Sequence, residues 1–185
     1  MIFASYFRPA DAIRDAAAIL LVSLAGCTAT PPPQSLPCPV VATVKDAAYM
    51  TRFVGGSEDL TDTTFESKVD AIHSQCFYVE SDGKKAIRTD LKIQFLASRG
   101  PKNVDGTAKF QYFVAVTGTG GQLLNREVFD VEIPLTTDKP QNITQDEIEP
   151  TIPLPQGQNG DYYRIYVGLI LTEQELAFNR RNPHQ

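Results

Sequence analysis

Residues 85–97 read KAIRTDLKIQFLA, and this stretch decides the fold class. Small or apolar residues fall on one face of the extended chain: Ile87, Thr89, Leu91, Ile93, Phe95 and Ala97. Polar residues fall on the other face: Arg88, Asp90, Lys92 and Gln94. Alternation with a period of two over a full strand length predicts a β-strand with one buried face.

The residues just before this strand predict a hairpin. Asp82-Gly83 tolerates positive φ angles at the centre of a tight turn, so the run Lys68–Glu80 should pair antiparallel with the strand. Its apolar residues lie on both faces, Val69 and Ala71 on one side and Ile72, Cys76 and Tyr78 on the other. A bulge near His73 would bring the two sets into one phase.

A second hairpin and another clear strand follow along the chain. Lys109–Thr117 and Gln122–Leu135 alternate in the same way and flank the glycine-rich turn Gly118–Gly121. Pro134 cannot donate a ladder hydrogen bond, which predicts a sheet edge near the end of the second run. Tyr162–Leu171 also alternates, and the weaker candidates are Val40–Val44, Ala48–Phe53 and Asn142–Ile152.

The end of the chain predicts one short helix. Thr172 is a suitable N-cap and Glu175 follows three residues later, which is the pattern of a capping box. Glu173–Arg180 then forms two turns, and Asn182-Pro183 ends them. Short strands joined by Gly and Pro turns, without a long helix, predict an all-β fold. We expect an antiparallel two-sheet sandwich of the immunoglobulin-like kind with a short C-terminal helix, or alternatively a barrel.

The N-terminus has the pattern of a signal peptide. Residues 16–26 read AAAILLVSLAG, an apolar run of 11 residues that is too short to span a bilayer as a helix. The stretch Leu24-Ala25-Gly26-Cys27 resembles the lipobox of bacterial lipoproteins. That resemblance implies cleavage before Cys27, lipidation of Cys27, and an anchor in an envelope membrane facing the periplasm. The alternative is an ordinary secretory signal with an incidental cysteine.

A proline-rich stretch predicts a tether. Residues 28–39 hold five prolines in twelve positions, which exclude a helix or a central strand and make a semi-rigid spacer. The expected organisation is a signal peptide (1–26), a lipidated Pro-rich tether (27–39) and a β-sandwich domain (40–185). Thr28, and not an acidic residue, follows the lipidated cysteine. In the lipoproteins that this chain resembles, that pattern favours the outer membrane.

The two remaining cysteines fit an oxidising compartment. Cys38 ends the tether and Cys76 lies in a predicted strand, so a disulfide would fasten the start of the domain to its interior. Two buried free thiols are the alternative. A metal site that used His73 and Cys76 would lack further ligands, since the chain has only two histidines. We expect no metal and no other cofactor.

Composition and motifs argue against several function classes. The formal net charge is −5 and the basic runs are no longer than Lys84-Lys85 and Arg180-Arg181, so nucleic acid is not an expected partner. No nucleophile–base motif, phosphate loop or calcium loop is present, which predicts a protein that is not an enzyme. Carboxylates cluster at Asp146-Glu147 with Glu149 and at Glu58-Asp59 with Asp62. A solvated loop is the simpler interpretation of each cluster, and a catalytic or calcium site is the alternative.

Several short stretches of the mature chain resemble a group of uncharacterised Gram-negative envelope lipoproteins. They are Thr51-Arg52-Phe53, Asp59-Leu60-Thr61-Asp62, Tyr112-Phe113-Val114-Ala115-Val116, Val131-Glu132-Ile133-Pro134 and Leu171-Thr172-Glu173-Gln174-Glu175-Leu176-Ala177. The resemblance implies an envelope location and supplies no activity. A further set of aromatic residues, Tyr49, Tyr162 and Tyr166, forms either a binding surface or ordinary sheet packing.

Three functions are compatible with these expectations, in order of preference. The first is a membrane-anchored, non-enzymatic interaction or structural module, which contacts another envelope protein through a sheet face or an exposed strand edge. The second is a carrier of a lipid or other apolar ligand between the sheets. The third is a hydrolase of envelope polymers, which would need two carboxylates to converge in a cleft.

Overall fold

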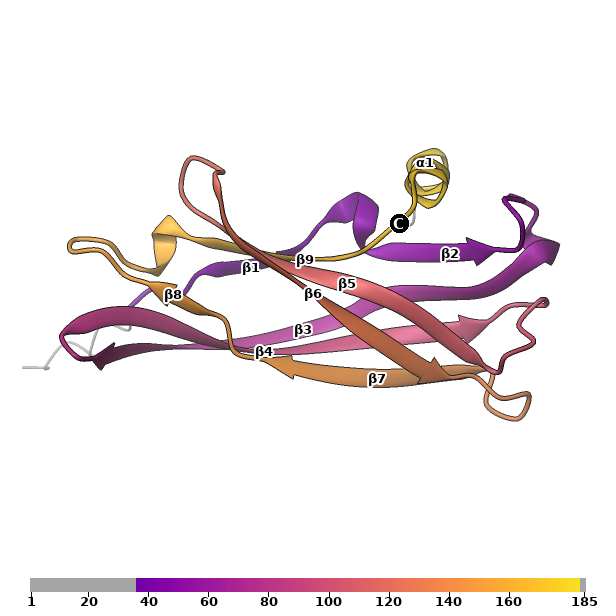
Figure 1. The fold of residues 1–185 in the computed structure, drawn as a ribbon, viewed down its shortest axis with the longest axis horizontal. Helices are drawn as coiled ribbons and strands as arrows, with labels where there is room; N and C mark the ends of the chain where they lie inside the picture. Colours follow the sequence, from indigo (N-terminus) through magenta and orange to yellow (C-terminus); the bar gives the residue numbers. More distant parts are fainter. Residues whose placement is uncertain (1–35, 184–185) are drawn as a thin grey trace, which may run out of the picture. The chain divides into compact units, whose positions relative to one another are not determined.

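The computed structural model describes residues 36–183, which belong to one structural unit and contain nine strands. The first sheet, called here the β5 sheet, has the order β1-β9-β5-β6, with the bounds β1 Val40–Thr43, β9 Arg164–Leu169, β5 Thr107–Thr117 and β6 Leu123–Pro134. The second, called the β4 sheet, has the order β2-β3-β4-β7, and β8 also pairs with β4. Its bounds are β2 Tyr49–Phe53, β3 Thr63–Ser81, β4 Lys84–Arg99, β7 Gln141–Ile148 and β8 Thr151–Pro153. The sheets pack face to face (Figure 1), so the expected two-sheet sandwich is confirmed and the alternative of a barrel is wrong.

The β3–β4 hairpin forms as the alternation predicts. Asp82 and Gly83 have φ angles of 51° and 71°, so both turn residues adopt the left-handed conformation that a tight hairpin turn requires. The expected inward face of β4 is buried along its whole length, with no member more than 1% exposed: Ile87, Thr89, Leu91, Ile93, Phe95 and Ala97.

The bulge in β3 lies earlier than expected. The register shifts at Asp70, between Val69 and Ala71, and not near His73. Val69 before the shift and Ile72 after it both pack against the core. Because neighbouring residues of a strand point to opposite faces, the extra residue has to lie between these two for both to face inward.

Aromatic rings fill the middle of the core between the sheets. Phe95 of β4 contacts Phe110 and Tyr112 of β5, with ring centroids 5.7 and 4.8 Å apart. Tyr112 in turn stacks on Phe129 of β6 at 5.1 Å. Aromatic side chains bury large apolar areas, so these contacts between strands of both sheets hold the two layers together.

The β5 sheet contains one pairing that the sequence did not indicate. β9 pairs antiparallel with β5, as does β6, but β1 pairs parallel with β9. β1 has four residues, too few for an alternating pattern to indicate its partner. β6 is an edge strand and ends at Pro134, which confirms the edge expected there.

The run Asn142–Ile152, expected as one weak strand, forms the two short strands β7 and β8. Both pair with β4, and the break between them falls at Glu149 and Pro150. Pro150 has no N–H to donate, but its carbonyl accepts a hydrogen bond from the Thr89 N–H at 3.0 Å. The chain therefore continues along β4 through the break.

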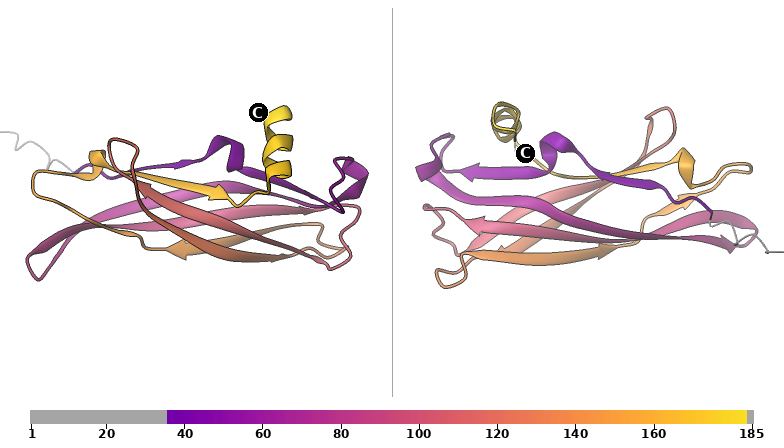
Figure 2. Two further views of the ribbon diagram at one scale, coloured as in Figure 1. Left: turned by 45° about the horizontal axis from the view of Figure 1, so that its top comes forward. Right: turned by 180° about the vertical axis from the view of Figure 1, so that it is seen from behind.

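Helix α1, Glu173–Arg181, begins with the expected capping box and packs against β2. The Thr172 hydroxyl accepts from the Glu175 N–H, and the Glu175 carboxylate accepts from the Thr172 N–H. The carboxylate also accepts from Arg52 Nε of β2 at 2.6 Å, and Glu175 is 5% exposed. Figure 2 shows α1 outside the two layers, beside the short turn η1, Lys45–Ala47.

Glu175→Ala is expected to lower the free energy of unfolding by about 2 kcal/mol, because it removes the capping box and leaves the half-buried Arg52 without its carboxylate. Urea unfolding measures this loss. Glu173→Ala is the matched control, since its exposed carboxylate lies in the same turn but outside the capping box, and its effect should stay below about 1 kcal/mol. Equal losses in the two variants would contradict the role given to Glu175.

Candidate functional site

Cys27 and the lipobox lie outside the described residues, so lipidation stays a prediction. The described part of the tether starts at Leu36. Within residues 36–183, no helix has the length and apolar character needed to cross a membrane.

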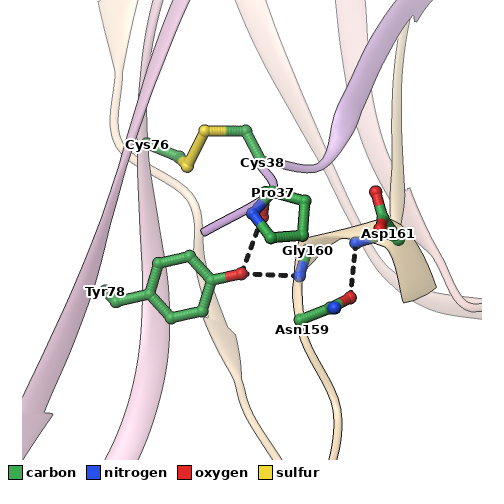
Figure 3. Close-up of a disulfide and its surroundings, with 7 residues drawn as sticks. All are labelled: Pro37, Cys38, Cys76, Tyr78, Asn159, Gly160 and Asp161. Atoms are coloured by element: carbon green, nitrogen blue, oxygen red, sulfur yellow. Dashed lines mark hydrogen bonds between the residues drawn. A yellow bond between two sulfur atoms is a disulfide. The ribbon is translucent and has the colours of Figure 1, made fainter. Parts of the chain in front are cut away.

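The expected disulfide forms close to the first described residue, Leu36. Cys38 and Cys76 are bonded, with their Cα atoms 5.7 Å apart (Figure 3). The alternative of two free thiols is therefore wrong, and Cys76 has no thiol with which to bind a metal beside His73. The bond joins the segment that precedes β1 to β3 of the other sheet, so it fastens the end of the tether to the domain.

Tyr78 and Gly160 hold the same segment beside the disulfide. Tyr78 Oη donates to the Pro37 carbonyl at 2.6 Å and accepts from the Gly160 N–H at 2.8 Å (Figure 3). A Cβ atom on residue 160 would overlap the Pro37 carbonyl oxygen and the Cys38 backbone, so only glycine fits here. The sequence carries no signal for either role, because both residues act on a segment that is distant along the chain.

Tyr78→Phe is expected to lower the free energy of unfolding by about 2 kcal/mol, because the Pro37 carbonyl and the buried Gly160 N–H both lose their partner. Chemical denaturation followed by circular dichroism measures the change. Tyr162→Phe, at a side chain 40% exposed, should change stability by less than about 0.5 kcal/mol. If Tyr78→Phe were as stable as this control, the phenol would not hold the segment.

The first carboxylate cluster lies on or near β7 and is divided among separate partners. Asp146 accepts from the hydroxyl of Tyr112 at 2.8 Å, and Glu147 pairs with Lys92 of β4 at 3.1 Å. Burial, together with the hydrogen bond to Asp146 and its charge, raises the pKa of Tyr112, so the phenol remains a donor. The solvated-loop interpretation is therefore wrong for Asp146, which lies on β7 and is half-buried.

The second carboxylate cluster is also divided. Each member has its own partner: Glu58 binds Arg181 of α1, Asp59 caps the turn η2 (Leu60–Asp62) through the Thr61 N–H, and Asp62 accepts from the Ser57 hydroxyl. In the part of the chain that the structure describes, no group of three or more His, Cys, Asp or Glu side chains could hold a metal ion.

The three tyrosines considered as an aromatic surface come from separate elements. Tyr49 lies on β2 of the β4 sheet and Tyr166 on β9 of the β5 sheet. Tyr162 ends the short turn η3, Gly160–Tyr162. The three rings thus come from two different sheets and a turn.

The strand edges are the features that another protein could meet. The edge strands are β1 and β6 in one sheet and β2 and β7, with β8, in the other. β1 is only four residues long, and β2 is covered by α1, since Asn179 Nδ2 of the helix donates to the Tyr49 carbonyl. β6 and β7 have 12 and 8 residues and lie on the same side of the sandwich, where Asn142 Nδ2 donates to the Pro134 carbonyl.

Half of the main-chain groups of β6 point away from β5. The Leu135 N–H donates to the Gly106 carbonyl at the end of this ladder, and bonded pairs alternate with unbonded pairs along an antiparallel ladder. The Ile170 N–H bonds Gln111 on the other side of β5, which agrees with this alternation. We call outward-facing those residues of β6 whose N–H and C=O groups point away from β5. They are Arg126, Val128, Asp130 and Glu132, and no described strand lies on that side of them.

The side chains divide β6 into an open part and a protected part. Leu123, Leu124 and Val128 are 60, 51 and 46% exposed. Farther along, Glu132 pairs with Lys109 at 3.2 Å, and Pro134 has no N–H for a partner. An added strand would therefore fit along the part of β6 that precedes Glu132.

A cleft of about 470 Å³ opens beside this edge, between β6 and the connection from β7 to β8. Its lining combines five apolar residues with four polar or charged ones: Val114, Val116, Phe129, Ile148 and Pro150, with Asn125, Glu127, Glu149 and Thr151. Both glutamates are exposed, so neither is withdrawn from water as a general acid in a hydrolase usually is. Only the tertiary structure brings β6 and the end of β7 together, which is why the sequence did not indicate this cleft.

Residues 36–183 have three features of functional interest. They are the segment before β1 that the disulfide holds, the open part of β6, and the cleft beside β6. Comparison of the chain with protein-family models, curated proteins and solved structures found no match. The function must therefore be inferred from the geometry of these three features.

Proposed function

We propose that this protein is a non-enzymatic interaction module of the bacterial envelope, and that β6 receives an extended strand of its partner. The observation that carries the proposal is the free edge from Arg126 to Asp130, which offers unpaired main-chain donors and acceptors next to exposed apolar side chains. Strand addition uses such main-chain groups for affinity and the neighbouring side chains for specificity.

The other edge strands are less suited than β6 to receive a strand of a partner. On β2, α1 occupies the outer side, and β1 offers only four residues. β7 has eight residues against twelve in β6. The outward-facing N–H groups of Ile143 and Glu147 on β7 already donate to the side-chain oxygens of the residues before them, Asn142 and Asp146. β6 is therefore the edge best suited to a partner.

A lipid anchor at Cys27 would place this module on a membrane, with the proline-rich segment as its spacer. The disulfide supports this part of the proposal, because such bonds persist in oxidising compartments such as the periplasm. The intact mass of the protein expressed with its own N-terminus, beside a Cys27→Ser variant, tests it. Acylation that is absent from both proteins would overturn the anchor, while the strand-addition proposal would be unaffected.

Photocrosslinking in cells tests the edge itself. A photoreactive amino acid at Val128 of the full chain should give a discrete adduct with another polypeptide chain. The same group at Ile143, which is 54% exposed on the edge of β7, is the matched control and should give none. If Val128 gives no adduct, or no more than Ile143, β6 is not the binding edge.

The cleft supports a second candidate function, a carrier of a lipid or other apolar ligand. Five of its nine lining residues are apolar, and its volume of about 470 Å³ lies in the range of small-molecule sites. Native mass spectrometry of the full chain purified from cells should then show a bound ligand, which is lost when Val116→Gln makes the lining polar. A ligand-free spectrum would overturn this candidate.

A further inference from the structure

We propose that the strand received by β6 is β6 of a second copy of this chain, so that two β5 sheets join edge to edge about a two-fold axis at Val128. This inference rests on the proposed function, since it uses the same free edge, and it adds the identity of the partner. The order of charges along the β6 edge is the reason for proposing a second copy of this chain as the partner.

Two outward-facing residues of β6 carry complementary charges about Val128. Arg126 and Asp130 lie at equal distances on either side of Val128 and carry opposite charges. In an antiparallel pairing centred on Val128, Arg126 of each copy lies opposite Asp130 of the other. Residues that lie directly opposite on one face of a sheet interact, and opposite charges there stabilise the pair.

Both charges are available for this contact. Among the described residues, neither Arg126 nor Asp130 forms an ion pair. The guanidinium of Arg126 lies over the Phe113 ring, 4.9 Å from its centroid, and Asp130 accepts from Gln111 Nε2 at 2.9 Å. Each side chain is exposed and is held near the sheet by a neighbour on β5.

The centre of the pairing is apolar. Val128 is 46% exposed and would lie opposite Val128 of the second copy. On the same face, Phe113 is the β5 residue directly opposite Val128 and is half-buried. Pairing would therefore cover a small apolar centre between two ion pairs.

Neighbouring registers are less favourable. A register that centres the axis on Arg126 places the two arginines opposite each other, and one that centres it on Asp130 does the same with the aspartates. The intermediate registers place Val128 opposite a charged residue, Arg126 or Asp130. Like charges that lie directly opposite destabilise a sheet, so the register centred on Val128 is the one in which every outward residue from Arg126 to Asp130 finds a suitable partner.

Charge reversal tests the pairing. In the full chain, R126D places two carboxylates opposite each other at each end of the pairing, and D130R places two guanidinium groups there. Each single variant should dimerise roughly 10- to 100-fold more weakly than the unchanged chain, because two attractive pairs become repulsive. The double variant R126D/D130R restores opposite charges in every pair and should regain the original dimerisation.

Mixing the two single variants gives the sharpest result. R126D and D130R should form a heterodimer with each other, because their edges are then complementary, although each alone is mostly monomeric. Sedimentation velocity in a density-matched detergent measures all five samples: the unchanged chain, the two single variants, the double variant and the mixture. The substituted side chains are exposed, so thermal unfolding should show that every variant is folded as the unchanged chain is.

Two results would overturn the self-pairing. One is a full chain that stays monomeric, and the other is a dimer that R126D and D130R leave unchanged. The Val128 photocrosslink separates this failure from failure of the proposed function. An adduct with the mass of two chains supports self-pairing, an adduct with a different protein overturns self-pairing but supports strand addition, and the absence of any adduct overturns both.

Discussion

Replacement of both Cys38 and Cys76 by serine is expected to lower the free energy of unfolding by about 4 kcal/mol. The disulfide closes a loop across a sequence separation of 38 residues, and loss of a loop of this size returns that much conformational freedom to the unfolded chain. The folded state also loses the bond that keeps Pro37 beside Tyr78 and Gly160. Urea unfolding of the full chain, read by circular dichroism, measures the change.

Cys27→Ser is the matched control for the disulfide variant, because it also removes a cysteine but leaves the bond in place. Its unfolding midpoint should equal that of the unchanged chain. A loss below about 1 kcal/mol in the Cys38→Ser/Cys76→Ser protein would contradict the stabilising role. The hydrogen bonds of Tyr78 would then be sufficient to hold the start of the domain.

Phe95→Ala is expected to lower the free energy of unfolding by about 4 kcal/mol, the usual cost of removing a buried phenylalanine ring. Phe95 is fully buried and contacts the rings of Phe110 and Tyr112 in the opposite sheet. The surrounding strands are hydrogen-bonded on both sides of β4, so they cannot close the space that the ring leaves. The same denaturation experiment measures the loss.

Val104→Ala is the control for this core variant, since Val104 is apolar but 90% exposed. Its effect should stay within about 0.5 kcal/mol. Similar stabilities for the two variants would show that the Phe95 ring does not join the sheets. Phe95→Leu should recover part of the loss, because it refills most of the volume.

The clearest parts of the fold were predictable because the information was local. Every second residue from Ile87 to Ala97 is buried, as the alternation indicated, and Asp82-Gly83 forms the turn that its positive φ angles allow. The capping box at Thr172 and Glu175 needs only four consecutive residues. Such features depend on neighbours in the chain, so the residue pattern is enough to indicate them.

Features that depend on another strand were predicted less well. The bulge lies at Asp70 and not near His73, since its position is set by which residues of β3 meet the core. Parallel pairing of β1 with β9 joins residues more than a hundred positions apart. The predicted disulfide between Cys38 and Cys76 is confirmed; the expected lipidation of Cys27 had left only these two cysteines to pair. The hydrogen bonds of Tyr78 to Pro37 and Gly160 depend on residues distant in the chain and are seen only in the structure.

The sequence by itself determined that the chain has an all-β body, where its hairpins turn and how its last helix begins. Local φ preferences, alternation and capping are properties of a few adjacent residues, and these settle such features. Only the tertiary structure decided which strand edges stay open. An edge is free or covered according to what packs beside it, and in this chain α1 covers β2 while no described strand or helix covers β6 from Arg126 to Asp130. The order Arg126, Val128, Asp130 is present in the sequence, but it can form the proposed pairing edge only because the fold leaves β6 at the end of its sheet.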